Sequence, residues 1–100
     1  MAAKSIHQGV SEFRNTPGAL LLDVRTPQEY RQGHIPGSKN LPLQQLDNAP
    51  FLTDNMDTAL FVYCHSGIRS SQAAIQLQEM GYTQVQSIGG IASYFGKLNR

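Results

Sequence analysis

The stretch Phe61-Val-Tyr-Cys64-His-Ser-Gly-Ile-Arg69-Ser-Ser71 decides how the rest of the chain is organised. A short apolar and aromatic run ends at the only cysteine of the sequence, and a loop that contains Gly67 and Arg69 then leads into a segment of helical character. In such an arrangement a strand brings a nucleophile to the N-terminus of a helix. The pattern alone leaves open whether the chemistry there concerns sulfur, phosphate or neither.

The best-defined elements flank this stretch. Residues 59–63 and 19–24 are apolar runs of strand length, and the second run is broken only by Asp23, which is typical of strands buried on both faces of a parallel sheet. Residues 68–80 place their apolar side chains at helical spacing, and Gly81 follows where a helix C-cap belongs. We therefore expect a buried strand, the cysteine loop and a helix in direct succession.

A second helix start follows the strand at 19–24. Thr26, Pro27 and Glu29 have the spacing of a capping box, with Thr26 as the N-cap, Pro27 at the first helical position and Glu29 reaching back to the free backbone N–H. Gly33 and Pro36 come soon afterwards. The helix that opens at Pro27 is therefore expected to be short.

Weaker patterns complete the chain. In order, they predict a short strand at Ile6, a helix over 10–14, turns over 33–40, a helical turn over 43–47, a loop over 50–57, a strand over 84–88 ended by two glycines, and a last helix over 91–98. Strands that alternate with helices indicate one α/β domain, residues 1–100, with a mostly parallel central sheet and helices on both faces. Ligands of such sheets bind at the carboxyl ends of the strands, where Cys64 is expected.

Composition narrows the classes of function. The 100 residues are 40% hydrophobic, which fits one domain with one core, and the net charge of +1 without charged blocks argues against nucleic acid or a membrane surface as partners. The N-terminus has no apolar leader and no run reaches the roughly 18 residues of a membrane span, so a cytoplasmic protein is expected. A single cysteine allows no internal disulfide and no cysteine-rich metal cage, and neither a cofactor nor a metal is expected.

The loop after Cys64 has the chemistry of a small anion cradle. A turn from strand to helix points backbone N–H groups inward, Gly67 permits the unusual dihedral angles, and a thiol at a helix N-terminus can have its pKa lowered from about 8.5 to roughly 3.5–7.5. Residues 65–71 contain no acid, although the first turn of a helix normally favours one. We therefore expect the site to hold a negative charge that comes from the sulfur or from a substrate.

Each of these residues also has a plainer interpretation. Cys64 could be a small buried hydrophobe at the end of a strand, and Arg69 a solvent-facing helix residue. The spacing Cys-x-Ser-Gly-x-Arg is more specific than a lone cysteine and favours the functional interpretation. We expect His65 to face the pocket mouth without acting as a general base, because a preformed thiolate needs none.

The remaining titratable residues are expected to be structural. His34 has no second ligand at a suitable spacing and should bond to a nearby backbone group. Asp23, if buried, needs a partner such as Arg25 or a helix N-terminus. Capping explains the position of Glu29 fully, and Arg25 is the expected ion-pair neighbour of Glu29.

Five motifs, in this order along the chain, resemble the single-domain rhodanese family. They are Leu22-Asp-Val-Arg25-Thr-Pro-Gln-Glu29-Tyr30, Gly33-His-Ile-Pro-Gly37-Ser38, Asn40, Val62-Tyr-Cys64-His-Ser-Gly-Ile-Arg69-Ser70 and Gly89-Gly-Ile91. The match spans about residues 6–94, nearly the whole chain. The resemblance makes Cys64 the catalytic cysteine, and it makes the following loop residues substrate-binding, namely His65, Ser66, Gly67, Ile68, Arg69 and Ser70.

The resemblance implies sulfurtransferase activity. In that interpretation Cys64 takes the sulfane sulfur of a donor such as thiosulfate, carries it as a persulfide and passes it to cyanide or a thiol. The expected partners are a small-molecule donor and a thiol acceptor, such as glutathione, a thioredoxin-like protein or a carrier protein, and a monomer is expected.

Two other classes of function stay open. A phosphatase relative of this fold uses a cysteine loop one residue longer than the four residues that separate Cys64 from Arg69, so the short loop favours sulfur over phosphatase or arsenate reductase chemistry. A non-catalytic binding or regulatory module is the other alternative, because a fold does not determine a function.

Overall fold

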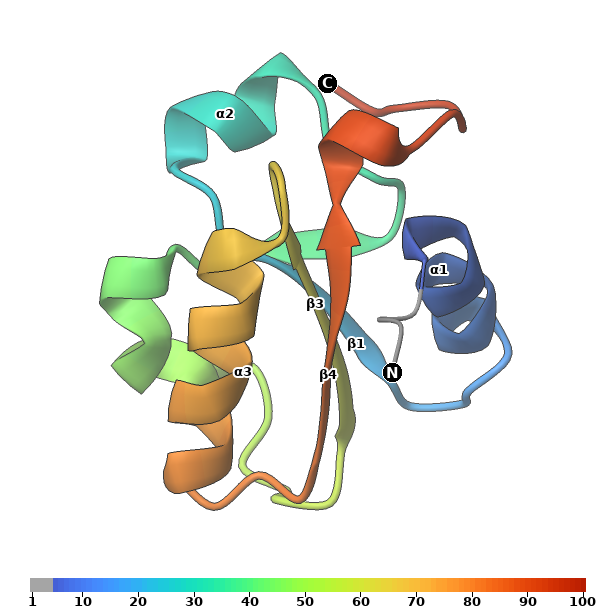
Figure 1. Cartoon of the computed structure of the whole chain (residues 1–100). Coiled ribbons are helices and arrows are strands. Elements are labelled where there is room, and N and C mark those ends of the chain that lie inside the picture. The colour runs from blue at the N-terminus through green and yellow to red at the C-terminus, as the bar shows by residue number, and fades with distance from the viewer. Residues whose placement is uncertain (1–4) are drawn as a thin grey trace.

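The computed structural model describes residues 5–100 and centres on a parallel four-stranded sheet with the strand order β2-β1-β3-β4 (Figure 1). The elements follow one another as α1 (Ile6–Arg14), β1 (Leu20–Asp23), α2 (Pro27–Gln32), β2 (Ser38–Asn40), the 3₁₀ helix η1 (Leu43–Phe51), β3 (Ala59–Cys64), α3 (Ile68–Glu79), β4 (Gln84–Gly90) and the 3₁₀ turn η2 (Ile91–Ser93). The predicted α/β class with a parallel sheet is confirmed.

β3 is the central strand, and its side chains divide the core into two layers. Leu60, Val62 and Cys64 belong to the layer beneath α3 and η1, whereas Phe61 and Tyr63 belong to the layer beneath α1. This division follows from the strand geometry, because successive side chains point to opposite faces of a sheet. The uninterrupted apolar run that predicted β3 therefore reflects burial on both faces.

Helices cover both faces of the sheet, as predicted. α1 lies on one face and α3 and η1 on the other, while α2 lies beyond the carboxyl ends of the strands (Figure 1). The capping box of α2 is present, with the Thr26 side chain accepting from the backbone N–H of Glu29 and the Glu29 side chain accepting from that of Thr26. α3 begins at Ile68, and Gly81 has the positive φ of 113° that a residue after a helix end often takes.

Two predicted elements at the ends of the chain are wrong. Ile6 begins α1 instead of a strand, because Ser5 and Gln8 form a second capping box that starts the helix at Ile6. Residues 91–98 form only the short turn η2, after which the backbone is extended at Tyr94 and Asn99 pairs with His34 through two backbone hydrogen bonds of 2.8 and 2.9 Å. The pairing with a distant segment outweighs the weak helical pattern.

The structure also differs from the sequence prediction within the sheet. β2 lies inside the passage predicted as turns, where three residues pair with β1 from Leu21 to Asp23. β4 continues through the two glycines expected to end it, because Gly90 still pairs with Cys64 after an irregularity in the register. Among residues 5–100, no helix has both the length and the apolar character needed to cross a membrane.

Candidate active site

Cys64 lies at the carboxyl end of β3 and its sulfur faces the start of α3. The loop from 65 to 67 turns the chain, and Gly67 acts as the N-cap of α3 with a φ of 104°, a conformation that glycine adopts without strain. This conformation directs the backbone N–H of Gly67 at the Cys64 Sγ, at 2.9 Å. The loop therefore directs a backbone N–H at the sulfur, as the turn from strand to helix predicts.

Ser70 completes the surroundings of the sulfur. It is fully buried, and its Oγ lies 3.6 Å from the Cys64 Sγ. Burial opposes ionisation of the Cys64 thiol, but hydrogen bonds from the side chain and backbone of Ser70 and from the backbones of Gly67 and Ser66 together lower its pKa. The first turn of α3 contains no acid that would oppose this effect. The site thus favours an anionic sulfur.

Gly90, the last residue of β4, and Ala92 of η2 hold the loop in place. A Cβ atom on Gly90 would overlap the carbonyl oxygen of His65, so only glycine allows this approach. The same carbonyl accepts a 3.1 Å hydrogen bond from the backbone N–H of Ala92 in η2. The loop position is therefore set by β4 and η2 as well as by its own sequence.

Arg69 forms a two-point ion pair with Glu29 of α2. Its Nη1 and Nη2 atoms donate to the two carboxylate oxygens at 2.8 and 3.0 Å, and both side chains are about one-third exposed. These hydrogen bonds, with a weaker contribution from the backbone of Thr26, outweigh burial and lower the pKa of Glu29 from 4.5 to about 2. The sequence prediction that Arg25 pairs with Glu29 is wrong, because Arg69 takes that place.

Arg25 instead pairs with Asp23 in the interior. Asp23 is fully buried, and its carboxylate accepts hydrogen bonds from Nε and Nη2 of Arg25 at 2.7–3.1 Å, while Nη2 also donates to the carbonyl of Gly33. The predicted partnership of Asp23 with Arg25 is confirmed. The structural role predicted for His34 is confirmed as well, since its Nδ1 lies 2.9 Å from the carbonyl oxygen of Tyr30.

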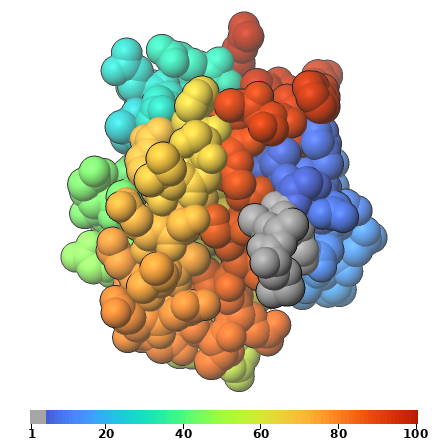
Figure 2. Space-filling view, viewed as in Figure 1, coloured from blue at the N-terminus to red at the C-terminus, as the bar shows by residue number. Residues whose placement is uncertain are grey.

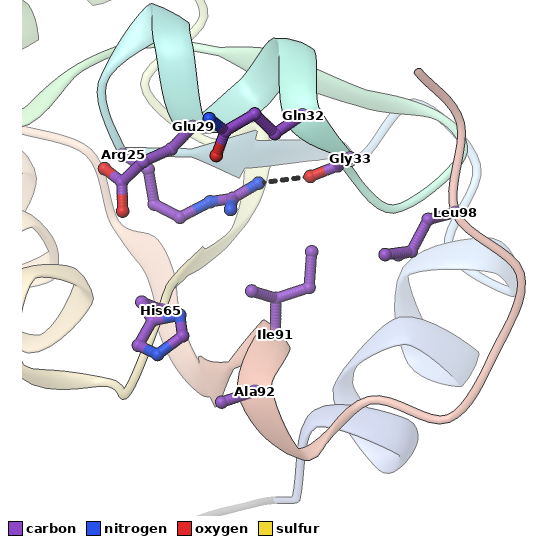
Figure 3. Close-up of a pocket in the computed structure, with 8 residues that line it drawn as sticks. All are labelled: Arg25, Glu29, Gln32, Gly33, His65, Ile91, Ala92 and Leu98. Atoms are coloured by element: carbon purple, nitrogen blue, oxygen red, sulfur yellow. Dashed lines mark hydrogen bonds between the residues drawn. The ribbon is translucent and has the colours of Figure 1, made fainter.

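A pocket of about 420 Å³ opens beside the cysteine loop, between α2 and the C-terminal residues 91–98 (Figure 3). Its lining comprises Arg25, Glu29, Gln32, Gly33, His65, Ile91, Ala92 and Leu98. In Figure 2 the yellow loop and start of α3 lie at the surface between the cyan α2 and the red C-terminal segment. The two charged groups that face the pocket are each paired with another side chain, so its walls are nearly neutral and partly apolar.

The comparisons with known proteins agree with this geometry. A model of the rhodanese-like domain family matches residues 7–97. The chain belongs to this family. It is 43% identical over 72 residues to the thiosulfate sulfurtransferase PspE of Escherichia coli, covering 70% of this chain and 68% of that protein. It is 37% identical over 84 residues to the thiosulfate sulfurtransferase GlpE of Ectopseudomonas mendocina, covering 83% and 74%.

The solved structures point to the same family. A rhodanese with anions from E. coli is similar to this rhodanese-like domain with a TM-score of 0.76 and 32% identity, covering 82% of this chain and 98% of that one. The family match and the two relatives named thiosulfate sulfurtransferase support a sulfurtransferase activity of the rhodanese type.

This rhodanese-like domain brings some predicted site residues together at the sulfur and leaves others at the rim. Gly67 and Ser70 contact Sγ, and a hydrogen bond from the backbone of Ser66 helps to lower the pKa of the Cys64 thiol. His65 lines the pocket, and Ile68 is exposed to 70% of its surface. Among residues 5–100, no group of three or more His, Cys, Asp or Glu side chains gathers as a metal site would require.

Two residues have contacts at the site that the sequence does not predict. For Glu29 the sequence predicts the capping box and an ion pair with the nearby Arg25, and it gives no sign of the actual partner, Arg69, which is 40 residues away. Ser87 lies on β4, and its hydroxyl contacts that of Ser70 at 2.8 Å. Only the pairing of β4 beside β3 brings Ser87 to the site, and that pairing follows from the folded sheet.

Proposed function

We propose that this protein is a sulfurtransferase that carries a sulfane sulfur as a persulfide on Cys64. The observation that carries the proposal is the position of Cys64 Sγ, which accepts from the backbone N–H of Gly67 at a helix start with no acid in its first turn. A sulfur in that position exists as a thiolate more readily than an ordinary thiol, and the thiolate is the nucleophile in sulfur chemistry.

In the first step the Cys64 thiolate attacks the outer sulfur of a donor such as thiosulfate. A bond forms between Sγ and the outer sulfur, the sulfur–sulfur bond of thiosulfate breaks, and sulfite leaves with the electron pair. The resulting persulfide is anionic. The N–H groups that stabilise the thiolate are suited to this anion too, because the charge stays at the same end of α3.

In the second step a nucleophile attacks the outer sulfur of the persulfide and returns Cys64 to the thiolate. Cyanide would leave as thiocyanate, and a thiolate acceptor would leave as a persulfide of its own. Having one cysteine fits this scheme, because the acceptor takes the place of an internal resolving thiol. The nearly neutral pocket beside the loop is the place we propose for the acceptor, whether it is a small thiol such as glutathione or the side chain of a thioredoxin-like or carrier protein.

The test is direct loading of the protein with sulfur. After incubation with thiosulfate, the intact protein should gain the mass of one sulfur atom, and Cys64→Ser should gain none. Addition of cyanide should then remove the added mass and yield thiocyanate. A protein that stays unmodified at millimolar thiosulfate would favour the binding-module alternative, and Cys64-dependent hydrolysis of an aryl phosphate would favour a phosphatase.

A further inference from the structure

Ser87 forms the far end of a line of two hydroxyl groups that leads to the catalytic sulfur. Ser87 lies on β4 opposite Val62 of β3, two residues before Cys64. Its Oγ is 2.8 Å from the Oγ of Ser70, and the Ser70 Oγ is 3.6 Å from Cys64 Sγ. Ser70 is fully buried and Ser87 is half-buried, so the hydroxyl next to the sulfur is shielded from water and the farther one is partly shielded.

The Ser70 hydroxyl has several possible hydrogen-bond acceptors around it and only one proton to donate. It carries one proton, yet the carbonyl oxygens of Gly67 and Gly89 lie 3.1 and 3.4 Å from its Oγ, in addition to the sulfur and the Ser87 hydroxyl. The Gly67 carbonyl does not depend on Ser70, because the backbone N–H and the hydroxyl of Ser71 donate to it at 3.1 and 2.8 Å. The Gly67 carbonyl therefore does not require the Ser70 proton, which can turn toward the sulfur.

The direction in which Ser70 donates must change with the charge on the sulfur. With a neutral thiol, the S–H group donates to the Ser70 Oγ, and the Ser70 hydroxyl donates onward to Ser87 or to a carbonyl. With an anionic sulfur, the Ser70 hydroxyl has to donate to Sγ, which leaves its oxygen lone pairs open to a donor. The Ser87 hydroxyl is within bonding distance of those lone pairs.

We infer that Ser87 is a positioning residue that donates to Ser70 and thereby holds the Ser70 hydroxyl toward the anionic sulfur of Cys64. A hydrogen bond accepted by a hydroxyl strengthens the one that it donates, so the pair stabilises the anion more than Ser70 does alone. The inference deepens the proposed sulfur transfer, since the Cys64 thiolate is the anion that attacks the donor and is formed again when the outer sulfur passes to the acceptor. The same hydrogen bonds affect the pKa of the Cys64 thiol in the resting protein, so the inference can be tested without a sulfur donor.

The test compares side chains of equal shape with and without a hydroxyl. Ser87→Thr keeps the hydroxyl, Ser87→Val replaces it with a methyl group, and Ser87→Ala removes it. The ultraviolet absorbance of the thiolate is followed against pH below the range in which tyrosine ionises, and no other thiol contributes because Cys64 is the single cysteine. We expect the apparent pKa of Cys64 to rise by about 0.5–1 in the Val and Ala variants, as the loss of one hydrogen bond implies, and to stay at the wild-type value in Ser87→Thr.

A second comparison tests whether Ser87 acts through Ser70. In a Ser70→Ala background, Ser87→Val should cause no further shift of the titration. Equal titration curves for Ser87→Thr and Ser87→Val, or a full additional shift in the Ser70→Ala background, would overturn the inference and leave Ser87 a packing residue. If Ser87→Val does not fold, Ser87→Ala against Ser87→Thr gives the same decision. Because no donor is used, failure here is distinct from failure of thiosulfate to load Cys64.

Discussion

The carboxylate of Glu29 has two structural roles. Its Oε1 accepts from the backbone N–H of Thr26 at 3.0 Å, which caps α2, and from Nη1 of Arg69 at 2.8 Å, which reaches the cysteine loop. The hydrogen bonds that Arg69 donates are the largest reason why the pKa of Glu29 falls from 4.5 to about 2. A single titration therefore connects the acid stability of the protein with the position of the loop.

This connection predicts a pH-dependent contribution to stability. A carboxylate whose pKa is lower in the folded state stabilises the fold fully above its unfolded pKa and loses that contribution as the pH falls through its folded pKa. For Glu29 the loss runs from pH 4.5 down to about 2. We expect Glu29→Gln to lower the free energy of unfolding by about 1 kcal/mol at neutral pH and to differ progressively less from the wild type toward pH 2, as measured by urea unfolding.

The matched control is Glu79→Gln, because Glu79 is an exposed carboxylate at the end of α3. Its free energy of unfolding should stay close to that of the wild type at every pH. A difference between Glu29→Gln and the wild type that is the same at neutral pH and near pH 2 would show that the ion pair with Arg69 contributes nothing measurable to stability.

Gly90 is the second residue whose substitution tests the loop. Its φ of −129° is open to any residue, so the cost of Gly90→Ala comes from the overlap of the new Cβ with the His65 carbonyl. Because the obstructing atoms are backbone, the loop has to move. We expect Gly90→Ala to lose roughly 1–3 kcal/mol of stability and, in addition, to reduce the rate at which thiosulfate loads Cys64.

Gly18→Ala is the control for Gly90→Ala. Gly18 has a φ of 79° and open space around its Cα, so alanine there costs roughly 1–2 kcal/mol through backbone strain while leaving the loop alone. Equal loading rates in the two variants would contradict the argument that Gly90 sets the position of the loop.

At the scale of elements, the Glu29–Arg69 pair links α2 to the start of α3 beside the pocket. The family resemblance predicts that Arg69 binds the donor, and its guanidinium lies against Glu29 with one-third of the side chain exposed. Donor binding by Arg69 stays a prediction. We expect Arg69→Ala to raise the KM for thiosulfate about tenfold, because it removes both the guanidinium cation and the ion pair with Glu29. We expect Glu29→Gln to raise the KM less, because the cation remains.

The double variant separates these two contributions. If Arg69 acts only through Glu29, Arg69→Ala and Glu29→Gln should have equal effects on KM, and combining them should add nothing. That result would make Arg69 a structural tie and remove it from the substrate-binding residues. A larger effect of Arg69→Ala that persists in the Glu29→Gln background would assign it a direct contact with the donor.

The elements that the sequence predicted well are those whose signal is local. β3 and β1 are continuous apolar runs, and the apolar residues of α3 recur at helical spacing. Thr26 and Pro27 are enough to predict the start of α2. β2 has three residues and gains its structure only by pairing with β1, and the end of the chain is extended because it pairs with His34. Such pairings join residues far apart in the sequence, and a pattern within one short stretch of sequence does not predict them.

The same distinction holds within the site. Cys64 and its loop are contiguous, so their spacing alone indicated an anion cradle. The contact of Arg69 with Glu29 and that of Ser70 with Ser87 depend on where α2 and β4 lie in the folded molecule. The sequence thus indicates the proposed nucleophile but does not show which distant side chains lie around it.

At the scale of the whole molecule, the buried pair of Asp23 and Arg25 connects the sheet to the pocket. Asp23 ends β1, and Arg25 reaches from it to the carbonyl of Gly33 after α2. The side chain of Asn40 in β2 donates to the backbone carbonyls of both residues at 3.0 Å. Three segments that form the carboxyl end of the sheet therefore meet at one ion pair.

This arrangement predicts that Asp23→Asn, which keeps the shape of the side chain and removes its charge, is strongly destabilising. It leaves the Arg25 guanidinium, 7% exposed, without its counter-charge, and breaking a buried pair in this way costs roughly 3–5 kcal/mol. Urea unfolding should show a loss of that size, whereas Asp47→Asn, at an exposed position in η1, should change little.

The double replacement Asp23→Leu with Arg25→Met distinguishes a lost attraction from an uncompensated charge. Replacing both members of a buried pair by apolar residues of similar volume is often neutral for stability, because neither charge then has to be desolvated. We expect the double variant to be more stable than Asp23→Asn, although it loses the hydrogen bond from Arg25 to Gly33. A double variant that is less stable than Asp23→Asn would mean that this link to the pocket wall, more than charge neutralisation, is what the pair contributes to the fold.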